Sequence, residues 1–347
     1  MTLQYYVRWG KFKVASQDFQ EELYMRVGLS VYGTMYGMGI NNMGNRPTIT
    51  PIQLLEKAHS LGLEGVEIPL NLMGGAEPAD VVKYAKERNM FIRAETGGLQ
   101  HEKLNEDLKL AAKLGSPTLR TIIGGAKLGG DRRPLAGKWK EYMKMVHTEL
   151  SQTMDTAKSL NMAVLLENHQ DITSEEILEL GEKLGSENFG IVLDCGNAMA
   201  TVEEPVAFAK KVAKYIKHVH LKDYWLYMTE EGYRLVRCPI GQGYMDFPAI
   251  FKILHEKNPN MTMTIEIGAL EARHVRMLAD DFWPDYPVRT APELAKVVAF
   301  ALKNAKPAAD WRTPHERGES VEAVIAYEDR ELLSSIAYVQ QLLKKYK

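Results

Sequence analysis

The chain has 347 residues, of which 45% are hydrophobic and 25% charged, so it is long enough for one large globular domain or two smaller ones. Its formal net charge of −2 gives no overall field that would attract nucleic acid or an anionic membrane, and we expect neither partner. Two cysteines, Cys195 and Cys238, are too few for a disulfide framework and fit a reducing, cytoplasmic compartment.

Residues 1–24 contain no clear periodic element and no signal-peptide core, and we interpret them as an N-terminal extension. From Met25 onward, strand and helix patterns alternate. The apolar run 26–31 predicts the first strand. Thr50 and Pro51 are typical of the N-cap and first position of a helix, which we expect to end at Leu61.

Further strand–helix units follow at regular spacing. The patterns predict strands at 66–68, 91–95 and 118–123, and helices at 78–88 and 103–114. A glycine-rich, basic loop over 124–138 leads into one long helix that ends near Leu160. Segments 248–257 and 292–303 are the expected seventh and eighth helices. Eight such units predict an α/β fold, a (β/α)8 TIM barrel over residues 25–306.

Two segments fall outside this repeat. Residues 224–244 form a long aromatic loop after the seventh strand, and loops of that length usually form a lid or a pocket wall. The tail, 307–347, has apolar residues at helical spacing from Val321 to Leu343. We expect a helix packed on the barrel wall or on another subunit.

Four apolar runs end in a side chain that can bind a metal: Glu167, Asp194, His220 and Glu266. In a parallel barrel the C-terminal ends of the strands meet on one face, so these side chains should converge there. The period of two gives them the same inward direction and turns their apolar neighbours toward the helices. An acidic residue after a strand is more often a loop start or helix cap, but four agreeing positions weaken that alternative.

Three carboxylates and one imidazole form a hard, mostly oxygen site for one divalent metal. Such a site suits Mn, our first choice, or Mg and Co, and is compatible with zinc or iron. The metal would act as a Lewis acid on a carbonyl or a developing enediolate. A ligand carboxylate or a nearby base could then remove the proton from the adjacent carbon.

The chain resembles the xylose-isomerase-like barrels of the sugar phosphate isomerase and epimerase family over roughly residues 25–306. The resemblance rests on Leu165–His169, Leu193–Asn197, His218–Asp223, Gly241–Gly243 with Asp246 and Phe247, and Ile265 with Glu266. It implies that Glu167 and Glu266 flank the substrate as an acid/base pair, and that all four groups hold the metal. Those epimerases often carry a histidine where this chain has Asn197.

A second resemblance, to the large subunits of bacterial C-glycoside deglycosidases, rests on Glu167-Asn168-His169, the aromatic loop and residues 268–274. It implies a lyase that removes the C2 proton of a 3-oxo-glycoside and expels the aglycone at C1. It also implies a small β-rich partner subunit. We therefore expect a small-molecule sugar or glycoside substrate, and a homo-oligomer or a hetero-oligomer of that kind.

His169 lies two residues after Glu167, so in an extended strand both side chains point to the same side and His169 should enter the same cavity. It lies roughly 6.6 Å further along the chain, which places it outside the metal's coordination sphere. A neutral imidazole with an ordinary pKa of about 6.5 could act as the general base, alone or with a metal-binding glutamate. The alternative is a hydrogen bond that orients a ligand.

Other polar side chains are candidates for substrate binding, each with a structural alternative such as a salt bridge or loop packing. The two histidines among them qualify only if their loops fold over the barrel. The candidates are Asn197, Lys222, Trp225, Arg237, His101 and His274.

Isomerisation, epimerisation and elimination all begin with the same proton abstraction, and these residues do not choose between them. One alternative is a zinc hydrolase like endonuclease IV, which should show more histidine ligands and a basic face. The other is a barrel that binds a sugar without turning it over, which the four retained ligand residues disfavour.

Overall fold

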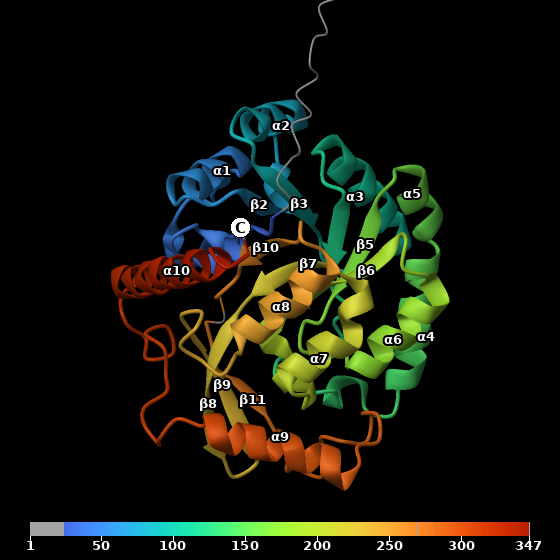
Figure 1. The fold of residues 1–347 in the computed structure, drawn as a ribbon, viewed down its shortest axis with the longest axis vertical. Coiled ribbons are helices and arrows are strands. Elements are labelled where there is room, and N and C mark those ends of the chain that lie inside the picture. Colours follow the sequence, from blue (N-terminus) through green and yellow to red (C-terminus); the bar gives the residue numbers. More distant parts are fainter. Residues whose placement is uncertain (1–23, 269, 347) are drawn as a thin grey trace, which may run out of the picture.

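Eight parallel strands close into a barrel surrounded by helices, in the order β1-β10-β7-β6-β5-β4-β3-β2 (Figure 1). This confirms the predicted (β/α)8 fold. The computed structural model describes residues 24–268 and 270–346, so the predicted extension lies outside them except for Tyr24. The barrel strands are β1 (Arg26–Ser30), β2 (Gly65–Pro69), β3 (Phe91–Glu95), β4 (Thr118–Thr121), β5 (Ala163–Glu167), β6 (Phe189–Asp194), β7 (Ile216–Leu221) and β10 (Thr262–Ile265).

The helices begin largely where the capping residues indicate. Thr50 accepts a hydrogen bond from the Gln53 amide and forms a capping box at the start of α1, with Pro51 as its first residue. The helices are α1 (Pro51–Ser60), α2 (Pro78–Glu87), α3 (His101–Lys113), α4 (Trp139–Ser151), α5 (Met154–Ser159), α6 (Ser174–Leu184), α7 (Pro205–Val212), α8 (Phe247–Lys257), α9 (Ala291–Asn304) and α10 (Val321–Leu343).

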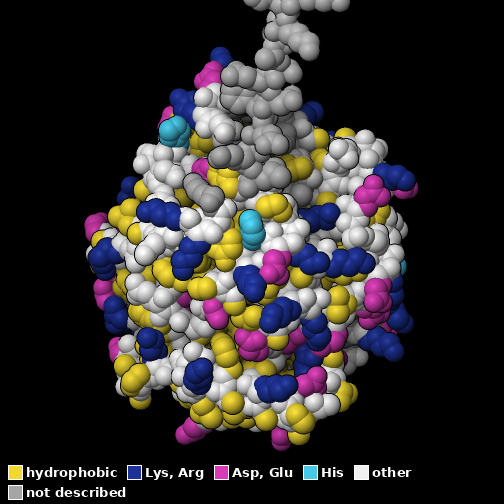
Figure 2. All heavy atoms as spheres, viewed as in Figure 1, with side chains coloured by type: hydrophobic (Ala, Val, Ile, Leu, Met, Phe, Trp, Pro, Cys, Tyr) yellow, Lys and Arg dark blue, Asp and Glu magenta, His cyan; other side chains and the backbone are white. Residues whose placement is uncertain are grey.

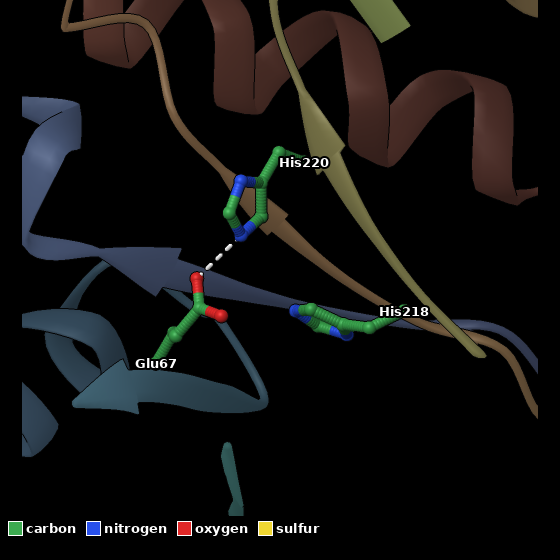
Figure 3. Close-up of side chains that lie close together, drawn as sticks. All are labelled: Glu67, His218 and His220. Atoms are coloured by element: carbon green, nitrogen blue, oxygen red, sulfur yellow. Dashed lines mark hydrogen bonds and ion pairs between the residues drawn. The ribbon is translucent and has the colours of Figure 1, made fainter. Parts of the chain in front are cut away.

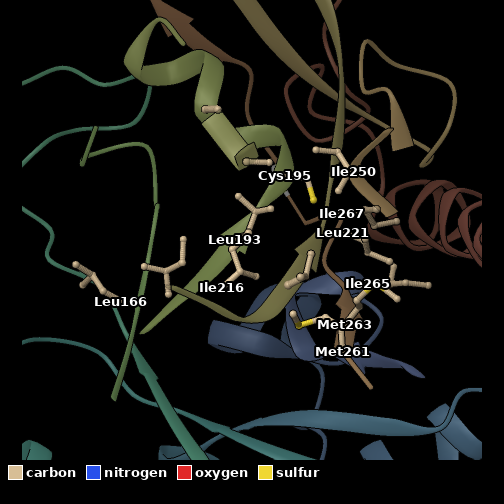
Figure 4. Packing of buried hydrophobic residues seen from close by; sticks show 14 of the residues in the cluster. Leu166, Leu193, Cys195, Ile216, Leu221, Ile250, Met261, Met263, Ile265 and Ile267 are labelled. Atoms are coloured by element: carbon tan, nitrogen blue, oxygen red, sulfur yellow. The ribbon is translucent and has the colours of Figure 1, made fainter. Parts of the chain in front are cut away.

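The core between strands and helices is built from the apolar residues that alternate with the predicted ligands. Leu166, Leu193 and Ile265 are buried in one large cluster (Figure 4), and each is the sequence neighbour of a predicted ligand. A small second cluster, which includes Leu165 and Val192, fills the inside of the barrel. The predicted inside–outside alternation is therefore present, and it directs the ligand candidates inward.

The long helix expected to end near Leu160 is instead two helices, α4 and α5. Side-chain hydroxyls compete with the helical hydrogen bonds at the break. Ser151 donates to the His147 carbonyl at 2.7 Å, and Thr153 donates to the Leu150 carbonyl at 2.7 Å. Strand β4 also ends at Thr121, two residues earlier than predicted.

The helix at 292–303 forms as α9, but it does not occupy the eighth position of the barrel. It packs against β8 (Asp223–Thr229), where the Lys306 amide donates to the Leu226 carbonyl (Figure 1). The tail helix α10 lies along the barrel wall instead. Gln340 bonds the Gly62 carbonyl after α1, and Tyr346 faces Phe251 of α8. The expectation of a helix on the barrel wall is confirmed, and α10 takes the place assigned to 292–303.

Residues 223–238 form an antiparallel hairpin outside the barrel. Strand β8 pairs with β9 (Gly232–Cys238), and β9 pairs with β11 (Arg273–Val275) to give a three-stranded sheet. The buried Asp223 carboxylate accepts backbone hydrogen bonds from Gly241, Gly243 and Met245, so it fixes the return of the chain to the barrel.

Arg237 was a candidate for substrate binding, but the structure places it between β9 and α10. Its Nε donates to Glu331 at 2.7 Å, and Nη1 lies 3.9 Å from Glu328. All three side chains are buried. Glu328 also accepts from the amides of Tyr36 and Gly37, so this pairing joins α10, the hairpin and the segment after β1. The salt bridge weighed as the alternative is the correct interpretation.

The surface matches the small net charge. Basic and acidic side chains are interspersed on the face shown in Figure 2. Within the described ranges, no helix combines the length and the apolar content that crossing a bilayer requires.

We predict that Arg237→Met lowers the free energy of unfolding by roughly 3–5 kcal/mol, because it leaves two buried carboxylates without their cation. Urea unfolding followed by circular dichroism measures this. Arg234→Met is the matched control, since Arg234 lies on the same strand, is half-buried and stacks over Trp311. It should cost about 1 kcal/mol or less. Equal losses in the two variants would show that the buried pairing adds nothing.

Candidate active site

A cavity of about 580 Å³ opens at the C-terminal ends of the barrel strands. This is the face where parallel barrels carry their chemistry, and the volume is within the range of small-molecule sites. The lining of the cavity combines charged and apolar side chains. Its charged and amide side chains include Glu95, Lys103, Asp107, Arg120, His169, Gln170, Lys222, Glu266 and Arg273. Its apolar and aromatic wall is formed by Tyr32, Met35, Pro69, Leu70, Leu110, Ile122 and Leu128.

The structure brings the four predicted metal ligands together. Glu167, Asp194, His220 and Glu266 each offer a ligand atom, and these atoms all lie within 4.8 Å of one another. All four side chains are buried. They come from the ends of β5, β6, β7 and β10, which are neighbours in the barrel. The order of the strands and the alternation of side chains along them therefore bring the four predicted ligands together.

The orientation of His220 is set from the opposite wall by Glu67 of β2. Its Nε2 lies 2.6 Å from Glu67 Oε2, a contact marked by the dashed line in Figure 3. An ionised carboxylate can only accept, so Nε2–H donates to it. Histidines that bind metals usually donate their second ring nitrogen in this way, which fixes the tautomer. The ring of His218 lies beside the pair but bonds Thr262 and Thr264.

Three buried atoms in the cluster lack a hydrogen-bond partner among the described residues: Glu167 Oε1, His220 Nδ1 and Glu266 Oε2. His220 Nδ1 lies 2.9 Å from Glu266 Oε2 and 3.5 Å from a Glu167 oxygen. With a proton on Nε2 alone, these atoms would present only lone pairs to one another. A cation between or beside them, or a second ring proton on Nδ1, relieves that arrangement. The donor set therefore fits a divalent metal held by these residues and Asp194.

Two cationic side chains already contact the cluster. Arg120 of β4 donates to Glu167 through Nε, at 2.5 Å, and through Nη2. Lys222 donates to Asp194 Oδ2 at 2.7 Å and to Glu266 Oε1 at 2.6 Å. Asp194 has both oxygens bonded, since it also accepts from Gly196 and Asn197. A metal at Asp194 would thus share these oxygens with protein donors.

The pKa values describe a site with surplus negative charge. Burial lowers the pKa of His220, but the carboxylates of Glu67, Glu266 and Glu167 together raise it well above its usual range. Burial raises the pKa of Asp194 to about 7, although Lys222 opposes that rise. The pKa of Glu167 falls well below its usual range despite burial, because Arg120 and His220 outweigh it. Without a metal, protons supply part of the missing positive charge.

His169 lines the same cavity, as its parity with Glu167 predicts. Its ring makes no hydrogen bond to another described residue, so it is open toward the cavity. Burial lowers its pKa to about 4, which corrects the expected ordinary value near 6.5 and leaves the imidazole neutral at neutral pH. Its role as a general base stays a prediction.

Of the substrate-binding candidates, Lys222 lines the cavity, whereas Asn197, Trp225, His101 and His274 do not appear among its described lining residues. Asn197 is buried and donates to Asp194 at 2.7 Å, so it supports a predicted ligand instead. The indole of Trp225 donates to the Gln242 carbonyl. His101 pairs with Glu149 beside the barrel, and His274 lies 3.0 Å from Thr229 in the small sheet.

The aromatic segment 224–244 was expected to form a wall over the cavity, and this expectation is wrong for the described lining residues. Its residues form the hairpin and the turn after it. Tyr224 stands behind the cavity, with its hydroxyl 3.2 Å from Asn197 Oδ1 and 3.4 Å from the Gln170 amide. The hairpin therefore supports the site from outside.

The sequence profile of the family described as "Xylose isomerase-like TIM barrel" matches residues 55–280, well over half of the chain. The chain belongs to this family. Curated relatives of this xylose isomerase-like barrel include the uncharacterized protein YihM of Escherichia coli, 24% identical over 64% of this chain and 67% of that protein. A 3-oxo-isoapionate decarboxylase of Pectobacterium atrosepticum is also 24% identical, over 54% and 66%.

An inosose dehydratase of Clostridium tetani is 28% identical over 39% of this chain and 49% of its own length. The chain thus spans about two thirds of the first two relatives and half of the third. Both relatives with named activities are enzymes.

Solved structures of other barrels of this kind confirm the fold. D-psicose 3-epimerase of Clostridium cellulolyticum gives a TM-score of 0.60 at 12% identity, covering 92% of this chain and 99% of that one. The 3-keto-D-glucoside 4-epimerase YcjR of E. coli gives 0.53 at 16%, covering 80% and 99%. The IolI protein, solved with a zinc atom, gives 0.52 at 15%, covering 82% and 100%.

Sequence analysis missed Glu67, Glu95 and Arg120 of this xylose isomerase-like barrel. Each is a buried charged residue that faces inward from β2, β3 or β4. The signal was available, because Glu95 ends an apolar strand as Glu167 does, and Arg120 interrupts one at an inward position.

We predict that Glu67→Ala weakens binding of Mn²⁺ by roughly 10–100-fold, because His220 loses the acceptor that fixes its tautomer. Glu67→Gln should lose less, since its amide oxygen still accepts from Nε2–H. Competition with a fluorescent chelator measures affinity without a substrate. The control is Glu87→Ala, an exposed glutamate at the end of α2. Wild-type affinity in folded Glu67→Ala would refute the tautomer argument.

Proposed function

We propose that the protein is a metal-dependent enzyme that removes the proton next to the carbonyl of an oxidised sugar, and that its substrates are 3-oxo-glycosides from which it eliminates the aglycone. The observation that carries this proposal is the convergence of unbonded Glu167, His220 and Glu266 atoms near a cavity whose lining also contains a set of apolar side chains.

A divalent cation, with Mn as first choice and Mg, Co or Zn as alternatives, would supply a Lewis acid for the substrate carbonyl at Glu167, Asp194, His220 and Glu266. The remaining steps belong to the chain's own residues. His169 lines the cavity with a free ring nitrogen and is positioned to accept the proton from the carbon next to the carbonyl. Lys222, which also lines the cavity, can donate to a substrate oxygen and offset developing negative charge.

The apolar part of the cavity lining favours a glycoside over a free sugar. A free ketose carries hydroxyl groups along its whole length and gains little from apolar contacts. Here Leu70, Leu110 and Ile122 line the cavity, and Leu128, also a lining residue, is 42% exposed. An aglycone would bury that apolar surface, which stabilises the complex in proportion to the area removed from water.

The relatives support an oxidised sugar. The decarboxylase from P. atrosepticum and the epimerase YcjR are named for 3-oxo or 3-keto sugars, and the inosose dehydratase is named for an elimination. Proton abstraction next to a carbonyl can begin both epimerisation and elimination. The homo-oligomer, or the hetero-oligomer with a small β-rich subunit, is part of the same proposal.

We expect the metal-loaded protein to exchange the C2 proton of a 3-oxo-glucoside for deuterium in deuterated buffer, as NMR of the recovered sugar would show. His169→Gln should bind the metal normally and lower the exchange rate roughly 10²–10⁴-fold, because an amide cannot carry the proton. Removal of the metal with a chelator should stop exchange, and added Mn²⁺ should restore it.

Other outcomes point elsewhere. Exchange that survives in His169→Gln would leave Glu167 and Glu266 as the acid/base pair. Tight binding of metal and 3-oxo-glucoside without exchange would favour a sugar-binding barrel. Exchange on free ketoses but not on 3-oxo-glucosides would favour an isomerase or epimerase.

A further inference from the structure

Glu95, at the end of β3, is a buried carboxyl group in the cavity that none of the roles above uses. It is 1% exposed and lines the cavity. Neither of its oxygens has a hydrogen bond to another described residue, and no other buried carboxylate in the described ranges lacks partners on both oxygens. Its nearest cation is Arg120, with Nη1 3.3 Å from Oε2, but the Nε and Nη2 of that guanidinium are directed at Glu167.

A carboxylate buried without donors is costly, and the usual outcome is that the group keeps its proton. Burial raises the pKa of Glu95 to about 8 although Arg120 opposes that rise, and the nearby negative charges of Glu67 and Glu266 act in the same direction as burial. Asp107 shows the contrast. It lines the same cavity, but Thr96 bonds it at 2.6 Å and Lys103 at 2.7 Å, so that carboxylate is fully engaged.

Glu95 lies between an apolar and a charged neighbour in the sheet. Its Cα pairs with Pro69 on one side and with Arg120 on the other, and all three residues line the cavity. Leu70, next to Pro69, also lines the cavity, whereas Arg120 bonds the carboxylate cluster. A glycoside with its sugar beside Arg120 and its aglycone beside Pro69 and Leu70 would place the bond between them near Glu95.

We propose that Glu95 is the general acid that protonates the departing aglycone. The proposal rests on the function proposed above, in which elimination follows removal of the C2 proton. As the bond from C1 to the aglycone breaks, its electron pair takes the proton from the Glu95 carboxyl. The electron pair left by the C2 proton forms the C1–C2 double bond. The products are an unsaturated 3-oxo sugar and the protonated aglycone, and Glu95 regains its proton from water.

The proposed base and the proposed acid come from the ends of two different strands. His169 follows β5 and Glu95 ends β3, with β4 between them in the barrel. One group takes a proton at C2 while the other delivers a proton at the leaving atom. General acids of this kind contribute typically about 10²–10⁴-fold, and the contribution grows as the leaving group becomes more basic.

The test compares Glu95→Gln with wild type on two 3-oxo-glucosides. One carries 4-nitrophenol, which can leave as its anion without being protonated. The other carries an unsubstituted alkyl alcohol, which must be protonated as it leaves. We expect elimination of the alcohol to fall roughly 10²–10⁴-fold in Glu95→Gln. Elimination of 4-nitrophenol and deuterium exchange at C2 should change by less than about tenfold, because neither step needs an acid at the leaving atom.

Asp107→Asn is the matched control, and it should leave the ratio of the two elimination rates unchanged. Glu95→Met, which cannot donate a proton either, serves as the second variant, and thermal unfolding confirms that each variant is folded. Equal losses on both substrates, or loss of C2 exchange, would assign Glu95 to binding or folding and overturn the proposal. Unchanged elimination of the alcohol would overturn it too. Absence of C2 exchange in wild type would instead refute the proposed function itself.

Discussion

Charge inside the barrel is the constraint on which the rest of the site depends. Five carboxylates face inward from the barrel strands, opposed by the cations Arg120 and Lys222 and by Arg93 of β3, whose Nε donates to Thr262. If every one of these carboxylates were ionised and the histidines were neutral, two negative charges would remain uncompensated in the buried site, where an unpaired charge is expensive. The five carboxylates are those of Glu67, Glu95, Glu167, Asp194 and Glu266.

A divalent cation carries the charge that this excess lacks. In its absence the protein can meet the constraint only by holding protons, and the raised pKa values of Asp194, Glu95 and His220 are that response. Asp194 and His220 belong to the predicted ligand set and would release protons if a metal entered, so metal affinity and proton affinity would oppose each other there, whereas Glu95 lies outside that set and keeps its proton. The clustering of the carboxylates and the raised pKa values of the groups near them thus have the same cause, the excess of buried negative charge.

Sequence alone predicted much of this arrangement, for a reason that particular residues make clear. The alternation in 163–167 fixes which residues face inward, and a parallel barrel brings strand ends together whatever their loops do. Glu167, Asp194, His220, Glu266 and His169 therefore lie where the pattern put them. Their burial follows from the same rule, since every apolar neighbour packs under the helices.

Predictions that depended on how segments outside the barrel fold were less specific, because such a residue has no barrel-strand periodicity to orient it. Trp225, His101 and His274 find partners beside the barrel, and no local pattern distinguishes those partners from a substrate. The eighth helix shows the same limit. Apolar residues at helical spacing give each of the segments 292–303 and 321–343 one apolar face. The spacing does not say which surface of the barrel that face covers. Buried pairs such as Arg237 with Glu331 decide that, and they join residues far apart in the chain.

The hairpin and α10 hold part of the cavity wall in place through buried pairs of this kind. Glu328 of α10 accepts from the backbone of Tyr36 and Gly37, in the segment that carries the cavity residues Tyr32 and Met35. The other end of that network is Arg237 in the hairpin. The part of the cavity wall formed by Tyr32 and Met35 is thereby tied to contacts on the outer side of the barrel. The hairpin also reaches the charged side chains, because Tyr224 contacts Asn197 and Gln170, and Asn197 donates to Asp194. The same outer elements therefore support both the wall and the carboxylate cluster.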